Sequence, residues 1–329
     1  MIFYITILTI LILCSFGKYS KLKLFLSFLI LFLIVSLKGE IGPDYEGYLV
    51  RYNNFDPIDS FYKVQGEFGW YLIEYFTYLN NWSYQMYTFF SALIGLGFLF
   101  VSQKKIKYLG FLVFIFQLVI VQLGLSGLRQ FIAVCILIYA ITIYLFEYQK
   151  SIRKFLILVF LASLFHISAL TFVIILPFLV RLKKNHLILI IILGVLGLSS
   201  QFLIDNIDKY DTRYLQGSRL SSGAWLRFAI TSTILFLGFN KSNKNMFYLG
   251  IFILLFGLVL GVINSIALHR FNYYFYPLSC LILVRNYKYS LIKKQVMTFV
   301  YLISASYLIF WFSFSKYSDS FIPYVFFFN

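Results

Sequence analysis

Long apolar runs separated by short polar stretches make up most of the 329-residue chain. The runs lie near residues 2–17, 24–38, 83–102, 108–124, 128–147, 186–204, 224–240, 246–268, 270–285 and 295–315. A helix needs roughly 20 apolar residues to cross a bilayer core, and most of these runs approach or reach that length. Segments of about ten alternating residues, typical of transmembrane β-strands, do not occur in the sequence. The pattern predicts an all-α polytopic integral membrane protein with about ten full spans.

One further apolar run, residues 155–180, predicts a broken span. Basic clusters flank it on both sides, so a single crossing would reverse the orientation of every later loop. Two short halves, broken near His166 and entering and leaving from the cytoplasmic side, avoid this reversal. Each half would be roughly 20 Å long at 1.5 Å per residue. A broken backbone cannot face lipid, so His166 would lie at depth in a re-entrant-like hairpin, buried in protein or beside water.

Basic clusters between the spans predict the topology. They lie at Lys18, Lys21 and Lys23; Lys104, Lys105 and Lys107; Lys150, Arg153 and Lys154; Arg181, Lys183 and Lys184; Lys241 and Lys244; and Arg285, Lys288, Lys293 and Lys294. The positive-inside rule places these loops in the cytoplasm and both termini outside. We therefore expect one transmembrane domain, residues 1–329, of 10–12 helices.

Two predicted outer loops are large, near residues 39–82 and 205–223. The second half of the first loop, from Glu67 onward, has apolar and aromatic residues at helical spacing, which indicates a helix lying in the membrane interface. The second loop mixes charges with tyrosines and amides. Aromatic faces stack on sugar rings and amides bond hydroxyls, so this composition is typical of a surface that handles carbohydrate.

Charge and cysteine content exclude several classes of protein. The net charge of +16 is concentrated in short loops beside spans, which is not the pattern of a nucleic-acid-binding surface. The three cysteines, Cys14, Cys135 and Cys280, all lie inside apolar runs and form no disulfide or zinc pattern. Three scattered histidines do not make a metal site. The N-terminus is apolar from residue 2, which favours a retained first span over a cleaved signal peptide.

Arginines at the outer ends of the spans are candidate anion ligands. Arg129 and Arg270 open two spans, and Arg213, Arg219 and Arg227 lie near the same outer level. Because a planar guanidinium binds phosphate oxygens through paired hydrogen bonds, this cluster would suit a diphosphate. The alternative is that each arginine reaches to the lipid headgroups. For Arg129, the polar and small residues that follow it favour a helix face turned toward the bundle.

His166 and Asp44 are candidate proton-transfer groups. His166 is either a core histidine bonded to a neighbouring helix or an acid–base group in a cavity. Asp44 follows a Gly-Pro pair just outside the second span. Its carboxylate would activate a sugar hydroxyl, bond Arg129 or Arg270, or simply belong to a solvated turn.

Five ordered motifs give the chain a resemblance to a known family. They are Asp44-Tyr45 with Tyr48; Leu128-Arg129-Gln130-Phe131-Ile132-Ala133; Leu161-Ala162 with Phe165-His166-Ile167-Ser168-Ala169-Leu170; Arg270 with Tyr273-Tyr274-Phe275; and Ile322-Pro323-Tyr324. The ordered set resembles the EpsG family, whose members are exopolysaccharide and O-antigen polymerases of the Wzy type. The arginine and histidine motifs, about 30 residues apart, are the more specific part.

The resemblance implies a glycosyltransferase that joins oligosaccharide repeat units carried on undecaprenyl diphosphate at the outer face of the bacterial cytoplasmic membrane. A glycosyltransferase-C-like helical bundle is one fold that this resemblance allows. It implies no cofactor, and a chain-length regulator of the polysaccharide co-polymerase type as a partner. The implied catalytic residues are Arg129, His166 and Asp44. The residues implied to bind substrate or diphosphate are Arg270, Arg213, Arg219, Tyr45, Tyr48, Gln130 and Tyr273.

Two other functions remain open from the sequence. A transporter or flippase of lipid-linked sugars would keep the same membrane architecture, but it should show matching discontinuous helices in two halves. A membrane acyltransferase that modifies polysaccharide would use His166 together with an acid or an asparagine nearby. Ser168 is the only polar residue close to His166 in the sequence.

Overall fold

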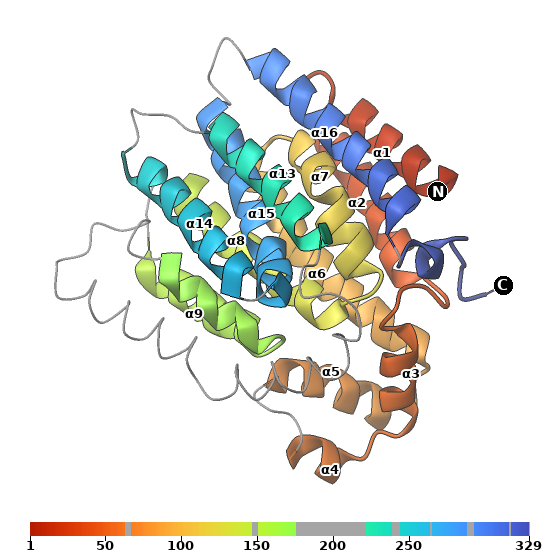
Figure 1. Cartoon of the computed structure of the whole chain (residues 1–329). Coiled ribbons are helices and arrows are strands. Elements are labelled where there is room, and N and C mark those ends of the chain that lie inside the picture. Colours follow the sequence, from red (N-terminus) through yellow and green to blue (C-terminus); the bar gives the residue numbers. More distant parts are fainter. Residues whose placement is uncertain are drawn as a thin grey trace, which may run out of the picture. The chain divides into compact units, whose positions relative to one another are not determined.

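The computed structural model describes residues 1–62, 67–146, 151–175, 222–238, 244–263, 265–287, 293–315 and 317–328 (Figure 1). These residues are mostly helical and contain no β-strand, only one isolated bridge between Lys38 and Phe326. The chain is an all-α polytopic membrane protein, as predicted. It forms two compact units, one of Met1–Ile167 with Tyr287–Asn329 and the other of Ser168–Asn286. Each unit is described separately.

The first unit holds most of the described helices. They are α1 (Ile2–Ser15), α2 (Lys21–Ser36), α3 (Tyr45–Asn53), α4 (Pro57–Tyr62), α5 (Phe68–Leu79), α6 (Tyr84–Ile106), α7 (Gly110–Ile115), the π-helix η1 (Phe116–Gly124), α8 (Leu128–Phe146), α9 (Ile152–Ser163), α16 (Lys293–Phe314) and the short 3-10 helix η3 (Ser318–Phe321). The second unit holds the 3-10 helix η2 (Ile167–Ile175), which begins at the boundary, and α13 (Ser222–Gly238), α14 (Lys244–Ile263) and α15 (Ser265–Tyr287).

Several described helices match the predicted spans. Three are long and apolar enough to cross a membrane, at Tyr84–Ile106, Leu128–Phe146 and Gln295–Phe314. Four shorter apolar helices lie at Ile2–Ser15, Gly110–Gly124, Gly223–Gly238 and Phe247–Val262. The predicted span at 186–204 lies outside the described residues. The helices at 21–36 and 265–287 also coincide with predicted spans.

Helix α8 forms the centre of the first unit. Nearly all of its residues are buried, and it packs against α6 and α9, while α2 packs on α6. Gly95 permits the close approach of α6 to α8, because a Cβ atom there would lie 2.5 Å from the ring of Phe131. Gly97, two residues later, has no neighbouring atom within 4 Å of such a Cβ. The small residue is therefore required at the first position and not at the second.

The predicted break at His166 is confirmed. Helix α9 ends at Ser163, residues 164 and 165 form a turn, and η2 begins at Ile167. Residues 176–180 lie outside the described part of the chain. That the two halves enter and leave from the same side of the membrane therefore remains a prediction.

The two ends of the chain meet at one end of the first unit (Figure 1). The hydroxyl of Tyr4 donates to the carbonyl oxygen of Phe321 at 2.8 Å, and the amide of Gly42 donates to Ser320 at 2.8 Å. Gly42 has a φ of +88°, and a Cβ atom there would lie 2.8 Å from Ser126. This arrangement agrees with a topology that places both termini on the same side of the membrane.

The helix predicted from Glu67 onward is α5. Its buried face carries Trp70, Ile73, Glu74 and Thr77, and Trp70 packs on the rings of Tyr48 and Tyr87. Large apolar residues on α5 remain exposed: Phe68, Leu72, Phe76 and Leu79. An amphipathic helix of this kind suits a membrane interface, and its placement there remains a prediction.

Candidate functional site

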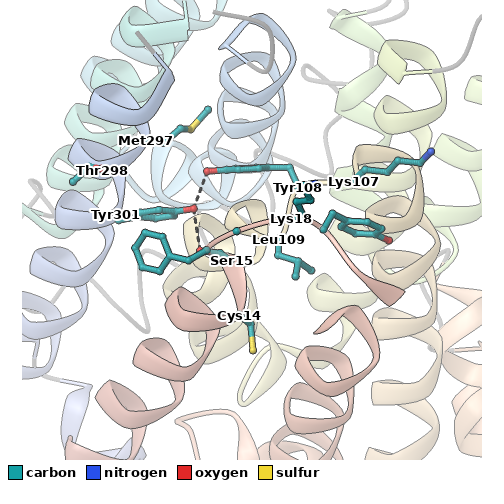
Figure 2. A pocket seen from close by; sticks show the side chains of 12 residues that line it. Cys14, Ser15, Lys18, Lys107, Tyr108, Leu109, Met297, Thr298 and Tyr301 are labelled. Atoms are coloured by element: carbon teal, nitrogen blue, oxygen red, sulfur yellow. Dashed lines mark hydrogen bonds between the residues drawn. The ribbon is translucent and has the colours of Figure 1, made fainter. Parts of the chain in front are cut away.

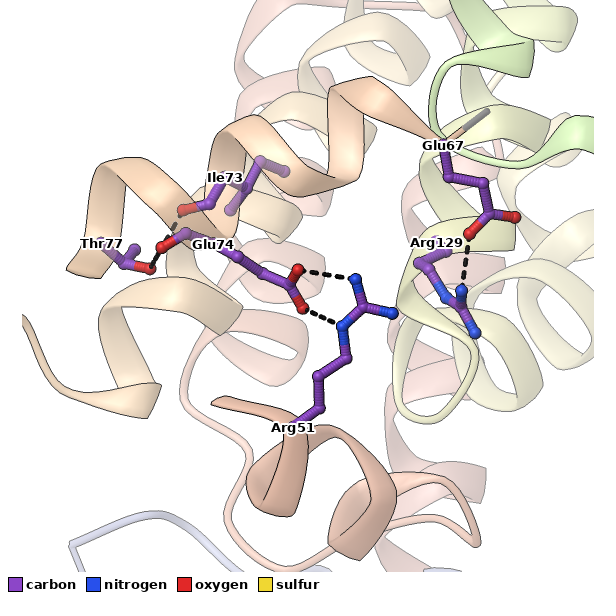
Figure 3. Close-up of polar contacts among 6 residues, drawn as sticks. All are labelled: Arg51, Glu67, Ile73, Glu74, Thr77 and Arg129. Atoms are coloured by element: carbon purple, nitrogen blue, oxygen red, sulfur yellow. Dashed lines mark hydrogen bonds and ion pairs between the residues drawn. The ribbon is translucent and has the colours of Figure 1, made fainter. Parts of the chain in front are cut away.

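Glu67 brings two predicted site residues together. One carboxylate oxygen of Glu67, Oε2, accepts a hydrogen bond from Nη1 of Arg129 at 2.6 Å (Figure 3). The other, Oε1, lies 2.7 Å from Nδ1 of His166. A single carboxylate therefore joins the start of α8 to the break after α9.

Backbone contacts explain why these residues meet. The carbonyl oxygen of Leu164 accepts hydrogen bonds from the amides of Gly69 at 2.8 Å and Trp70 at 3.4 Å, which belong to the first turn of α5. A Cβ atom at Gly69 would lie 3.2 Å from that same oxygen. The first turn of α5 is thus fixed against the turn after α9. Glu67, just before α5, and His166, just after the turn, are placed within reach of each other.

The side chain of Arg129 contacts Glu67 and Tyr48 and is otherwise partly exposed. Its guanidinium carbon lies 5.8 Å from the centre of the Tyr48 ring, within the range of a cation–π contact. The side chain of Arg129 is 35% exposed, against 12% for Glu67 and 15% for His166. A guanidinium has five N–H donors, so the contact with Glu67 leaves donors that can bind an incoming anion.

The carboxyl of Glu67 is ionised at neutral pH. Burial opposes ionisation, but the hydrogen bonds from His166 and Arg129, with the positive charge of Arg129 and of His166 in its protonated form, lower the pKa of Glu67 to about 2. An ionised carboxylate can only accept hydrogen bonds, so Nδ1 of His166 must carry the proton in their contact. In a neutral His166, Nε2 then holds the lone pair. This is the tautomer that a general base requires.

A second ion pair lies beside this site. Nε and Nη2 of Arg51, on α3, bind the two carboxylate oxygens of Glu74, on α5, at 2.7 and 2.8 Å (Figure 3). Glu74 is only 1% exposed. Burial raises its pKa, and the charge of Arg51 opposes the rise. The pair fixes α3, which carries Tyr48, to α5, whose N-terminus carries Glu67.

Asp44 is bound to the loop before Arg129. Its carboxylate accepts a hydrogen bond from the hydroxyl of Ser126 at 2.9 Å, although the residue itself is exposed. Nearby, Lys38 is buried and its Nζ donates to the carbonyl oxygen of Leu125 at 2.5 Å. These contacts fix residues 125–126, which immediately precede α8. The structure therefore assigns Asp44 a positioning contact and leaves part of its carboxylate accessible.

The other predicted residues of the first unit lie around this group. Tyr48 is buried beneath Arg129, and the ring of Tyr45 makes an edge contact with Tyr84 at 5.4 Å. Gln130 is half-buried, and its Nε2 has no hydrogen-bond partner within the described part of the protein.

Arg270 and Tyr273 lie on α15 in the second unit. There, Nη1 of Arg227 on α13 lies 2.7 and 2.9 Å from the two ring nitrogens of His269 and 3.1 Å from the hydroxyl of Tyr273. Arg227 is buried, while Arg270 is half-buried. Arg213 and Arg219, predicted to bind the diphosphate, lie outside the described residues.

Glu67 was missed as a site residue by the sequence analysis. It stands at the start of an amphipathic helix, where an acidic residue is common, and 99 positions separate it from His166. Only the packing of the first turn of α5 against Leu164 makes it a partner of the histidine. Among the described residues, no group of histidines, cysteines and carboxylates could hold a metal ion.

Comparison with known families agrees with the ordered motifs. The EpsG family model matches residues 21–326. The chain belongs to the EpsG family. The match includes Asp44, Glu67, Arg129, His166 and the Arg270 motif, so the resemblance predicted from the sequence is confirmed. Membership in the EpsG family supports a polysaccharide polymerase-like function in a membrane. No curated protein and no solved structure matches the chain.

Proposed function

We propose that this EpsG-family protein joins oligosaccharide repeat units carried on undecaprenyl diphosphate at the outer side of the bacterial cytoplasmic membrane. A hydroxyl of one repeat unit attacks the anomeric carbon of another unit. The new glycosidic C–O bond forms as the bond from that carbon to the diphosphate oxygen breaks, and undecaprenyl diphosphate leaves. The observation that carries the proposal is the contact of Glu67 with both Arg129 and His166.

His166 is the proposed general base. Since Glu67 holds the proton of His166 on Nδ1, Nε2 can take the proton from the attacking hydroxyl. The resulting imidazolium is stabilised by the same carboxylate, as in other histidine–carboxylate pairs. Asp44 remains the second candidate, because its carboxylate is accessible.

Arg129 is the proposed ligand of the departing diphosphate. Negative charge grows on the leaving oxygen as the bond breaks, and a guanidinium stabilises that charge more strongly than it stabilises the bound substrate. The partly exposed position of Arg129 over Tyr48 supports this role. We propose that Arg270, Arg213 and Arg219 also bind the diphosphate. A separate variant of each arginine tests this role.

An acyltransferase remains a second candidate because of one specific observation. That function requires an acid beside His166, and Glu67 supplies it at 2.7 Å. Both reactions would use the histidine as a base, but only polymerisation requires a cation at a departing diphosphate. The partial exposure of Arg129 therefore favours the polymerase.

A gene deletion in the native host separates the candidates. Loss of a polymerase leaves single repeat units on the outer leaflet, and loss of a flippase leaves them on the inner leaflet. Loss of an acyltransferase leaves long chains that lack an ester. Complementation with Arg129→Ala should not restore long chains, whereas the exposed-site variant Glu46→Gln should. An Arg129→Ala protein that inserts normally and still polymerises would overturn the proposal.

A further inference from the structure

A cavity of about 480 Å³ lies in the first unit, at the C-terminal end of α1 (Figure 2). The end of α1, the turn between α6 and α7, and the first turns of α16 line it. The residues that matter to its chemistry are Ser15, Lys18, Lys107, Tyr108, Met297 and Tyr301. None of these residues belongs to the site around Glu67.

The cavity is formed by chain segments that carry positive charge only. Residues 1–39, 83–146 and 293–315 contain no aspartate or glutamate. Lys18 and Lys107 line the cavity, and Lys107 extends away from the tyrosine pair in Figure 2. All three segments contribute loops that the positive-inside rule places in the cytoplasm. The charge around the cavity therefore favours an anion at the inner membrane surface.

Hydroxyl groups lie together on one wall of this cavity. The hydroxyl oxygens of Tyr108 and Tyr301 are 2.7 Å apart, and the Ser15 hydroxyl lies 3.1 Å from that of Tyr301 (Figure 2). Gly110 lets the tyrosines approach, because a Cβ atom there would lie 2.2 Å from the Tyr301 oxygen. The Ser15 hydroxyl also donates to the carbonyl oxygen of Ile12 at 2.7 Å, so the three hydroxyls are largely paired already, and their oxygens can still accept hydrogen bonds from a hydroxylated headgroup.

Apolar surface beside the cavity favours a lipid over free phosphate. Phe16 lines the cavity and is exposed. Leu13 on α1, and Phe299 and Leu302 on α16, are also exposed. A free phosphate ion would gain nothing from these side chains, whereas an acyl chain would remain in an apolar environment against them.

We propose that this cavity binds the phosphodiester headgroup of an anionic phospholipid in the inner leaflet. The amines of Lys18 and Lys107 pair with the phosphate, and the hydroxyls of Ser15, Tyr108 and Tyr301 bond the headgroup. The acyl chains lie along the exposed apolar residues of α1 and α16.

Lipid-dependent thermal stability of the purified full-length protein tests this proposal. The protein in detergent is titrated with phosphatidylglycerol, phosphatidylcholine or inorganic phosphate, and the unfolding midpoint is followed. Each lysine near an anionic surface contributes on the order of 1 kcal/mol, or about fivefold in affinity. Lys18→Gln with Lys107→Gln should therefore lower the apparent affinity for phosphatidylglycerol, obtained from the titration, about 30-fold. Tyr301→Phe, which removes one hydroxyl, should lower the same apparent affinity about fivefold.

The matched control is Lys104→Gln with Lys105→Gln. It removes the same net charge, from the last turn of α6, but neither residue lines the cavity, and Lys104 lies over the ring of Phe100. Midpoints in phosphatidylcholine alone identify any variant that is simply misfolded. Weaker stabilisation by phosphatidylglycerol in the cavity variants, together with unchanged stabilisation in the control, supports the proposal. Equal effects of both lysine pairs, an equal response to phosphatidylcholine, or full stabilisation by inorganic phosphate would each overturn it.

Discussion

Glu67 and His166 are joined by a 2.7 Å contact between Oε1 and Nδ1. The carboxylate is ionised, so it fixes the proton on Nδ1 and leaves Nε2 of a neutral imidazole as an acceptor. The same carboxylate holds Arg129 through its second oxygen. One acidic residue thereby positions a proposed base and a proposed diphosphate ligand.

Replacing Glu67 by glutamine should slow polymerisation without preventing insertion. Glutamine has nearly the same shape but no charge, so His166 loses the partner that fixes its tautomer and stabilises its protonated form. General-base catalysis typically contributes 10²–10⁴-fold, and we expect a loss of roughly 100-fold in the rate of chain growth. The measurement is the length distribution of polysaccharide in complemented deletion cells, followed over time.

Two further variants control that experiment. Glu67→Asp keeps the charge on a shorter side chain and should recover part of the rate, whereas a purely structural role would give no such rescue. Glu46→Gln removes an exposed carboxylate from α3 and should grow chains normally. Equal rates for wild type and Glu67→Gln would contradict the role of the carboxylate.

The stabilising effect of Glu67 should depend on pH. Its pKa in the folded protein, about 2, lies below the ordinary value of 4.5. The ionised carboxylate therefore stabilises the folded state fully above about pH 4.5, and this contribution disappears as the pH falls through about 2. The difference between the two pKa values corresponds to about 3 kcal/mol.

Unfolding measurements on wild type and Glu67→Gln in detergent check this dependence. Between pH 5 and pH 3 the difference in free energy of unfolding should fall to roughly half. A difference that stays constant or grows between pH 5 and pH 3 would show that Glu67 is not held as an ionised acceptor.

Removing Arg51 should destabilise the first unit because it leaves the Glu74 carboxylate buried and uncompensated. Breaking a buried ion pair from one side costs about 3–5 kcal/mol, and the partial exposure of Arg51 places this case at or below the lower end. Arg51→Gln combined with Glu74→Gln should recover most of the loss, since no buried charge remains. Additive losses in a double-mutant cycle of thermal unfolding would contradict a direct coupling.

Two glycines of α6 provide a test of the contact with α8. Gly95→Ala should cost about 1–3 kcal/mol, because the new methyl group would lie against the Phe131 ring at 2.5 Å. Gly97→Ala should be neutral or slightly stabilising, because nothing lies within 4 Å and alanine favours a helix. Thermal unfolding of the two variants gives the comparison, and equal stability would argue against this packing.

Hydrophobic runs and charge placement predicted the long apolar helices that the structure describes, because both depend only on local sequence and on the bilayer. Helices α3 and α4 were not predicted, since they lie in the stretch that was predicted as an outer loop. The break at His166 was predicted for the same reason, since an unbroken run would have reversed the later loops. Glu67 could not be predicted as a site residue, because its role arises from the docking of α5 against Leu164. The contact of Asp44 with Ser126 likewise depends on tertiary packing.

Polymerisation by purified protein with purified lipid-linked repeat units tests the central claim most directly. Arg129→Gln and His166→Gln should each reduce chain growth, and the coupled release of undecaprenyl diphosphate, by at least about 100-fold. Glu46→Gln should retain the wild-type rate. A correctly inserted Arg129→Gln or His166→Gln protein that elongates chains within a few-fold of wild type would contradict the proposed mechanism.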